Sequence, residues 1–183
     1  MHGLIFNELK KFANTRFGEG TWDALVQAAA LKRRPYLATE AYPDEELLAL
    51  VGAACAATHR RPDVLLEDFG EFIAPDLFST YGLILDRRWG LLDFLLETEK
   101  VIHRAVRLQN PGAEPPVLRA ERLGPNEVAI VYGSARSMCS VAMGIIRGAA
   151  THYGTPARIR ESECMKLGAP VCRIVVTTTS ART

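Results

Sequence analysis

The sequence predicts an α+β fold in which a helical part precedes a part built on a sheet. Apolar residues recur at helical spacing from residue 1 to about residue 109, whereas strand-like alternation begins only after the Pro- and Gly-containing connector at 110–116. Helices that come first and strands that follow favour an α+β architecture over a parallel α/β sheet. We therefore expect one domain over 1–183, with a mainly helical subdomain at 1–109 and a sheet-containing subdomain at 117–183.

The first subdomain carries clear helix start signals. Helices are expected at about 21–31, 43–55, 62–69 and 89–108. Thr21 has the side chain of an N-cap residue, and Pro43 and Pro62 stand where a proline suits the beginning of a helix. The helix at 89–108 is the longest, and its apolar face is expected to lie in the core.

The second subdomain is expected to form a β-β-α-β-β unit with an antiparallel sheet. Strands are expected at 117–123, 127–133, 157–164 and 172–178, with a helix at 136–153 between the two pairs. The Gly-Pro-Asn sequence at 124–126 predicts a turn, so the first two strands should form a hairpin. Gly154 and Pro156 are expected to end the helix.

The composition is that of an ordinary globular domain with balanced charge. The chain has 22 Lys and Arg residues against 21 Asp and Glu residues, and 48% of its residues are hydrophobic. Balanced charge provides no strongly basic surface, so we expect no nucleic-acid binding. The N-terminus lacks the apolar run of a signal peptide, and no apolar stretch approaches the roughly 18 residues that suggest a membrane span. We therefore expect a cytoplasmic protein, in which the 4 cysteines are free thiols or metal ligands.

A Tyr-x-Ser-x-Arg string follows the second expected strand. On an extended segment, residues two apart point the same way, so Tyr132, Ser134 and Arg136 can converge on one face. Two hydroxyls and a guanidinium fork suit a ligand with a pair of carboxylates. The alternative is a surface strand that carries these side chains by chance.

His103 lies inside the long apolar helix expected at 89–108. A single histidine in such a helix is either a partly buried structural residue or a metal ligand. Its spacing alone leaves both readings open.

Five features together resemble, in order and spacing, the heme nitric oxide/oxygen-binding (H-NOX) domain family, and the resemblance covers essentially the whole chain. They are the opening Met-x-Gly, the stretch Asp68-Phe69-Gly70, the helix with His103, the pair Pro115-Pro116, and the Tyr-x-Ser-x-Arg string. The family occurs as stand-alone bacterial sensors and as the regulatory domain of soluble guanylate cyclase. The resemblance is to the stand-alone bacterial type, and it implies a pocket that encloses one b-type heme.

The resemblance also implies roles for individual residues. His103 would be the proximal iron ligand, and Tyr132, Ser134 and Arg136 would bind the heme propionates. The family places apolar side chains against the macrocycle at positions that match Ile5, Pro116 and Ile145, with Pro116 pressing on the ring. One departure from the family is an extra residue in the helix before His103.

The same resemblance predicts which gases bind. Family members that hold oxygen have a distal Tyr five residues after the motif Arg, and this chain has Val141 there. We therefore expect a five-coordinate ferrous heme that binds NO and CO but forms no stable oxygen complex. The chain is expected to be a sensor and not an enzyme. One sensor domain fills its 183 residues, so it should signal to a separate histidine kinase or cyclic-di-GMP enzyme.

Three cysteines suggest a second site. Cys164 and Cys172 stand at the inner ends of the last expected hairpin, and Cys139 lies in the first turn of the preceding helix, so their thiols can form part of a zinc site. A subset of H-NOX proteins resembles this pattern, with three cysteines and a histidine. Glu161 occupies that histidine position, and His152 is a less favoured fourth ligand. The alternatives are small buried apolar cysteines, or a reversible disulfide between Cys164 and Cys172.

A different class of function also fits the C-terminal hairpin. Its Cys-x7-Cys spacing with a central Gly looks like the four-vinyl-reductase type of small-molecule-binding domain. In that alternative the chain is a heme-free binding domain or zinc scaffold, possibly a thiol or zinc redox sensor, and His103 is structural.

Overall fold

The computed structural model describes residues 1–110 and 112–179. Its elements, in chain order, are α1 (Gly3–Phe17), α2 (Thr21–Ala28), α3 (Asp44–Thr58), α4 (Pro62–Tyr81), the 3₁₀ turn η1 (Gly82–Ile84), α5 (Leu91–Thr98), the π-helical turn η2 (Glu99–His103), α6 (Arg104–Gln109), β1 (Val117–Gly124), β2 (Glu127–Gly133), α7 (Cys139–His152), β3 (Ala157–Glu163), the 3₁₀ turn η3 (Met165–Leu167) and β4 (Cys172–Thr178). Pro111 of the expected connector and residues 180–183 of the expected domain lie outside the described residues.

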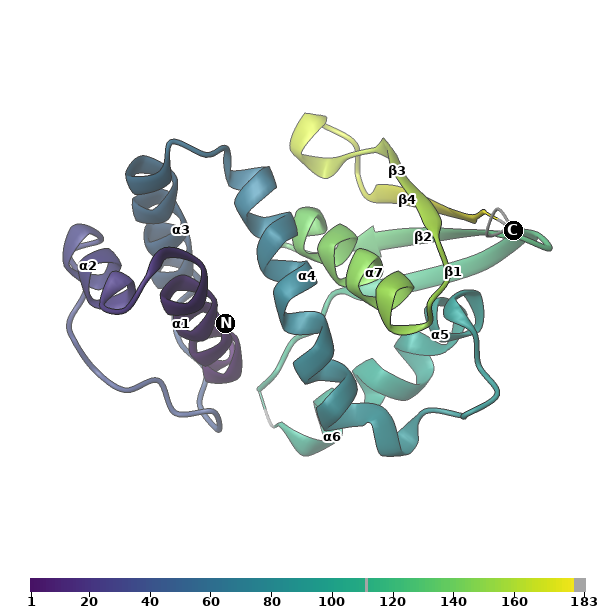
Figure 1. Cartoon of the computed structure of the whole chain (residues 1–183), viewed down its shortest axis with the longest axis horizontal. Helices are drawn as coiled ribbons and strands as arrows, with labels where there is room; N and C mark the ends of the chain where they lie inside the picture. Colours follow the sequence, from purple (N-terminus) through teal and green to yellow (C-terminus); the bar gives the residue numbers. More distant parts are fainter. Residues whose placement is uncertain (111, 180–183) are drawn as a thin grey trace.

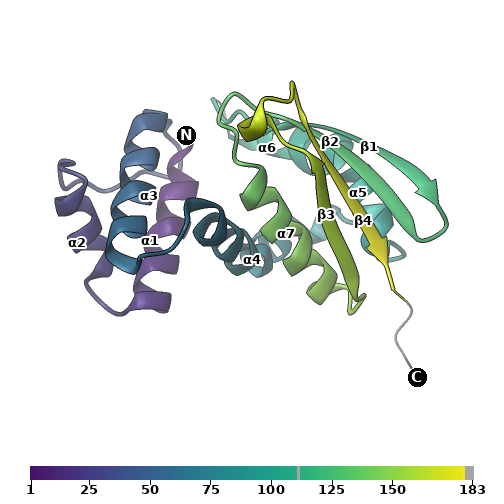
Figure 2. The same ribbon diagram turned by 90° about the horizontal axis from the view of Figure 1, so that it is seen from above.

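The expected α+β fold is confirmed. The strands form one antiparallel sheet in the order β1-β2-β4-β3. Helices α1, α2 and α3 form a separate group, and α4 lies between that group and α7, which runs along one face of the sheet (Figures 1 and 2). No helix in the described part of the chain is both long and apolar enough to span a membrane.

Two hydrophobic cores meet along α4. The first lies under the sheet, where Ile130 of β2 and Ile174 of β4 pair in register and face α5 and α7. The second lies among α1, α2 and α3 and is rich in aromatic rings. Helix α4 contributes Phe78 to the first core and Phe69 to the second, so it joins the two halves of the molecule.

Helices α4 and α7 approach one another closely because glycines line their contact. A Cβ atom on Gly144 of α7 would lie 2.1 Å from the carbonyl oxygen of Glu67, and one on Gly70 of α4 would lie 2.2 Å from the carbonyl oxygen of Val141. Both distances are far inside van der Waals contact. The two backbones therefore touch where other side chains would hold them apart.

The structure corrects four local expectations. Gly20 is the N-cap residue of α2, and Thr21 is the first helical residue. The hydroxyl of Thr21 donates to the carbonyl of Gly18 at 2.7 Å and does not cap the helix. The third expected helix continues to Tyr81, well beyond residue 69. The long expected helix at 89–108 consists of α5, η2 and α6, and the π-helical turn η2 contains one residue more than an α-helical turn over the same rise. Helix α7 begins at Cys139 and not at residue 136, because Ser137 has a positive φ of 50°.

Candidate functional site

A cavity of about 290 Å³ lies between the helical half and the sheet. Its wall is mostly apolar and is built from the start of α1, from α4, from α5 through α6, from the segment before β1, and from β2 and α7. Eight residues singled out from the sequence line it: Ile5, His103, Pro116, Tyr132, Ser134, Arg136, Val141 and Ile145. Residues far apart in the chain thus meet at one concave site.

His103 reaches the cavity from the end of the π-helical turn η2. Its side chain is 13% exposed, and its Nδ1 atom lies 2.8 Å from Oε2 of Glu99. Burial lowers the pKa of His103 below its usual value, although the Glu99 carboxylate opposes that shift. The ring is therefore neutral near pH 7, and with Nδ1 engaged, Nε2 is the nitrogen left to bind a metal.

Tyr132, Ser134 and Arg136 line the cavity, but a turn brings them together and not a strand. Strand β2 ends at Gly133, and the backbone N–H of Arg136 donates to Oγ of Ser134 at 3.2 Å. Tyr132 is buried, and that burial raises the pKa of its hydroxyl, which therefore stays a donor at neutral pH. The expectation that an extended chain aligns all three side chains is wrong.

Arg136 is engaged by protein carboxylates. Its Nε donates to Oδ2 of Asp44 at 2.8 Å, and its Nη1 donates to the carbonyl of Glu114 at 2.9 Å. Asp44 also accepts a hydrogen bond from the amino group of Met1 at 2.6 Å. Burial by itself would raise the pKa of Asp44, but these two cationic partners outweigh it and lower the pKa. The weakest bond of Arg136 joins Nη2 to Oε2 of the exposed Glu114 at 3.4 Å, so Nη2 is the donor most available to a ligand.

His2 is a polar residue of the cavity wall that sequence analysis did not single out. It lines the same cavity and is 8% exposed, and its Nε2 atom has no hydrogen-bond partner among the described residues. Burial also lowers the pKa of His2. A buried polar atom without a partner is rare in native proteins, so Nε2 of His2 marks a point of the wall that ordered water or a bound molecule would satisfy.

The cavity has the chemistry that a heme requires. Its wall is apolar, a neutral imidazole can supply the iron ligand, and hydroxyl and guanidinium donors can hold two carboxylates. Val141, Ile5 and Ile145 add only apolar atoms to the wall, so these three side chains provide no hydrogen-bond donor.

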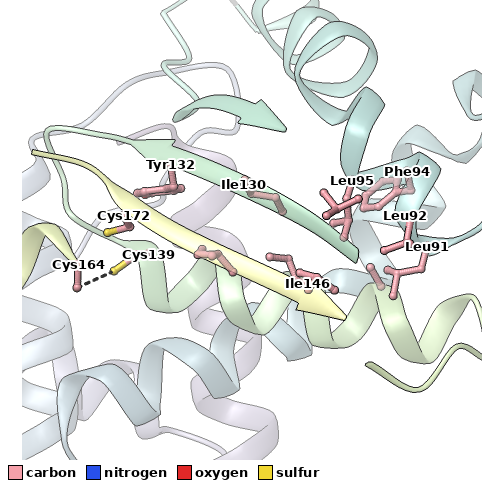
Figure 3. Close-up of a cluster of buried hydrophobic side chains, with 14 of the residues drawn as sticks. Leu91, Leu92, Phe94, Leu95, Ile130, Tyr132, Cys139, Ile146, Cys164 and Cys172 are labelled. Atoms are coloured by element: carbon pink, nitrogen blue, oxygen red, sulfur yellow. Dashed lines mark hydrogen bonds between the residues drawn. The ribbon is translucent and has the colours of Figure 1, made fainter. Parts of the chain in front are cut away.

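A second cluster lies directly beside Tyr132. The ligand atoms of Cys139, Glu161, Cys164 and Cys172 all lie within 4.8 Å of one another. The sulfur atoms of Cys139 and Cys164 are 3.8 Å apart, and Figure 3 shows this pair with Cys172 close to the ring of Tyr132. The three cysteines are buried.

The fold of the last hairpin explains how Glu161 joins the cysteines. Along β3, Ile159 faces the core opposite Val176, and by the two-residue period Glu161 faces the same way, opposite Ile174. A bulge follows between Glu161 and Glu163. The Oε1 atom of Glu161 is buried and has no hydrogen-bond partner among the described residues. An inward carboxylate of this kind calls for a cationic partner.

His152 does not belong to this cluster. It is the last residue of α7, whereas Cys139 is the first, which separates them by about 20 Å along the helix. Its ring stacks on Phe78 with centroids 3.8 Å apart. The expectation that His152 can serve as a substitute ligand is therefore wrong.

Comparisons with known proteins agree with this geometry. A family model described as Haem-NO-binding matches residues 2–161. A curated relative, soluble guanylate cyclase 89Db from Drosophila melanogaster, is 23% identical over 140 residues, which cover 75% of this chain and 21% of the relative. The chain thus spans about a fifth of that relative's length.

Two solved structures from Shewanella oneidensis match nearly every residue. A crystal structure of an H-NOX protein in the Fe(II)NO ligation state has a TM-score of 0.92 and 26% identity, and the match covers 98% of this chain and 100% of that one. An NMR structure of an H-NOX domain in the Fe(II)CO ligation state has a TM-score of 0.88 and 26% identity, with 99% and 100% covered.

Proposed function

Because this chain belongs to the Haem-NO-binding family, a family of heme-based gas sensors, we propose that it senses NO, and also binds CO, at a b-type heme held by His103. The observation that carries this proposal is the neutral imidazole of His103 in the wall of an apolar cavity that also holds Tyr132, Ser134 and Arg136. When bound, a ferrous heme with one histidine ligand offers an open iron position to small gases.

The residues of the wall divide the task of holding the heme. Tyr132 and Ser134 would donate hydrogen bonds to the propionates, and Arg136 would add a charged bond through Nη2 while Asp44 keeps the rest of its guanidinium in place. Ile5, Pro116 and Ile145 would pack against the ring, with Pro116 pressing on it. His2 lies in the same wall, and its unpartnered Nε2 is a further atom that a bound polar group would satisfy.

Gas selectivity follows from the missing donor at Val141. At a ferrous heme, oxygen would need a hydrogen-bond donor from the protein to stay bound, whereas NO and CO would not, and the side chain of Val141 supplies none. We therefore expect the reduced protein to bind NO and CO and to show no long-lived oxygen complex in air. A persistent oxygen spectrum would contradict this prediction.

A matched pair of variants at Val141 separates the effect of a donor hydroxyl on oxygen binding from the effect of added side-chain size. Val141→Tyr introduces a ring and a donor, and Val141→Phe introduces the ring alone. We expect oxygen to be retained measurably longer by the Tyr variant than by the Phe variant, with CO binding similar in both. Stopped-flow mixing of the reduced proteins with oxygen would check this. Equal oxygen lifetimes would contradict the assignment of Val141 to the gas-binding side.

Signal output is proposed to pass through another protein. The matched family consists of sensor domains, and on this basis we propose that the chain catalyses no reaction itself. Its partner would be a histidine kinase or a cyclic-di-GMP enzyme in the cytoplasm. A purified chain that takes up no heme would contradict the sensor function and favour the heme-free small-molecule-binding alternative.

A second candidate function is zinc binding at the cysteine cluster. In a tetrahedral site with zinc–sulfur distances of about 2.3 Å, ligand sulfurs lie about 3.8 Å apart. The sulfurs of Cys139 and Cys164 are 3.8 Å apart in this structure. Burial raises the pKa of Cys139 and of Cys172, so these thiols stay protonated at neutral pH unless a metal displaces the protons.

Metal analysis would test the zinc site. We expect about one zinc per chain, lost in Cys164→Ser and retained in Cys55→Ser, because Cys55 lies on α3 outside the cluster. Zinc removal with a chelator should expose three additional reactive thiols. Protein purified without zinc, with all four cysteines equally reactive before and after chelation, would contradict the site. A Cys164–Cys172 disulfide found by mass spectrometry would favour the redox alternative.

A further inference from the structure

We infer that Glu99 is a positioning residue that fixes the tautomer and orientation of the His103 ring and strengthens it as an iron ligand. This inference rests on the proposed function and deepens it. Sequence analysis did not single out Glu99, although it stands four residues before His103, where side chains on a helix meet.

The Glu99 carboxylate is held by three donors from three elements. Its Oε2 atom lies 2.8 Å from Nδ1 of His103 and accepts the backbone N–H of Leu118 in β1 at 3.1 Å. Its Oε1 atom accepts from Nη2 of Arg107 in α6 at 2.7 Å. Glu99 is 28% exposed, so the network is partly shielded from water. The turn that carries His103 is thereby tied both to the next helix and to the edge strand of the sheet.

Surrounded by these donors, the Glu99 carboxylate is the acceptor of a hydrogen bond from Nδ1–H of His103. With Nδ1–H donated to Glu99, the lone pair of the ring sits on Nε2, the atom needed by a metal. A carboxylate partner of this kind orients a ligating imidazole and raises its basicity.

Arg107 limits this effect. It binds the other oxygen of the same carboxylate and draws charge away from the oxygen that faces His103. Glu99 and Arg107 should therefore act on the ligand strength of His103 in opposite directions.

The first test measures the iron–histidine stretching frequency of the ferrous, heme-loaded protein by resonance Raman spectroscopy. Glu99→Gln keeps the size of the side chain and removes its charge, so we expect the frequency to fall. Glu97→Gln is the matched control, because it makes the same change on a carboxylate whose ion pair is with Lys100 at 3.6 Å. We expect no shift in the control.

Arg107→Met is expected to shift the iron–histidine stretching frequency in the opposite direction. Without the cation, more negative charge remains on Oε2 of Glu99, and the frequency should rise. A general loosening of the helix would lower the frequency in both Glu99→Gln and Arg107→Met. The sign of the second shift therefore separates positioning from structural damage.

Heme transfer to excess apomyoglobin gives an independent readout. Loss of the group that hydrogen-bonds a metal-ligating histidine typically costs about 10–100-fold in metal affinity. Glu99→Gln should therefore release heme at least about 10-fold faster than the unsubstituted chain. Glu97→Gln should release it at the unsubstituted rate. An unchanged iron–histidine frequency in Glu99→Gln would overturn the role of Glu99. An equal fall of that frequency in Glu97→Gln or in Arg107→Met would overturn it as well. An unsubstituted chain that takes up no heme would instead overturn the proposed function, and this inference with it.

Discussion

Replacing His103 by glycine is expected to remove most of the heme from the protein, and added imidazole is expected to restore it. Loss of only the group that hydrogen-bonds a ligating histidine typically lowers metal affinity about 10–100-fold. Loss of the iron ligand itself should lower the affinity for heme further. The substitution leaves a space the size of an imidazole beside an apolar cavity, into which the free base can bind. The Soret absorbance per chain, measured with and without imidazole, checks both statements.

His2 provides the matched control for that experiment. Among the described residues that line the cavity, His2 and His103 are the two histidines, and burial lowers the pKa of both. His2→Ala should keep most of the heme and need no imidazole to bind CO, because it removes one polar atom of the cavity wall and leaves the iron ligand in place. Heme loss in His2→Ala together with retention in His103→Gly would reverse the assignment of the iron ligand. Recovery of heme on adding imidazole would also show that His103→Gly still folds.

Gly144→Ala is expected to destabilise the protein by about 1–3 kcal/mol or more, the usual cost of overpacking a close contact. The added Cβ atom would lie 2.1 Å from the carbonyl oxygen of Glu67, which is backbone and cannot rotate away. Helices α4 and α7 would have to separate, and both form walls of the cavity. We therefore expect weaker heme retention as well as a lower free energy of unfolding.

Gly52→Ala is the control with the opposite sign. Gly52 lies inside α3, and no atom stands within 4 Å of a Cβ placed there. Alanine should therefore stabilise the protein by about 0.4–1 kcal/mol, because it restricts the unfolded chain without a clash. Urea unfolding of the two variants at equal heme loading would compare them. Equal midpoints would contradict the close approach of α4 and α7.

Local patterns in the sequence predicted the four strands and the helices that follow residue 20, but not α1 at Gly3–Phe17. Alternating residues on β2 and β4 face a buried core, and a periodicity of two is readable without any tertiary information. The close approach at Gly70 and Gly144 could not be predicted, because a glycine in a helix carries no record of the backbone that will pack against it.

The candidate site was predictable in its members more than in its geometry. The Tyr-x-Ser-x-Arg string pointed to Tyr132, Ser134 and Arg136, which do line one cavity. The turn that brings them there depends on Ser134 accepting a backbone hydrogen bond and on the positive φ of Ser137, neither of which follows from residue type. His2 comes from the far end of the chain, so only the folded arrangement places it at this wall.

The π-helical turn at Glu99–His103 has a consequence for evolutionary change in this segment. A π-turn contains one residue more than an α-turn that spans the same rise, and such turns are frequent at functional sites. A chain one residue shorter between Leu95 and His103 could close the segment as an uninterrupted α-helix and still direct a histidine to the cavity. A one-residue deletion inside this turn would therefore shorten the spacing between Glu99 and His103 from four residues to three, at which side chains on a helix still meet.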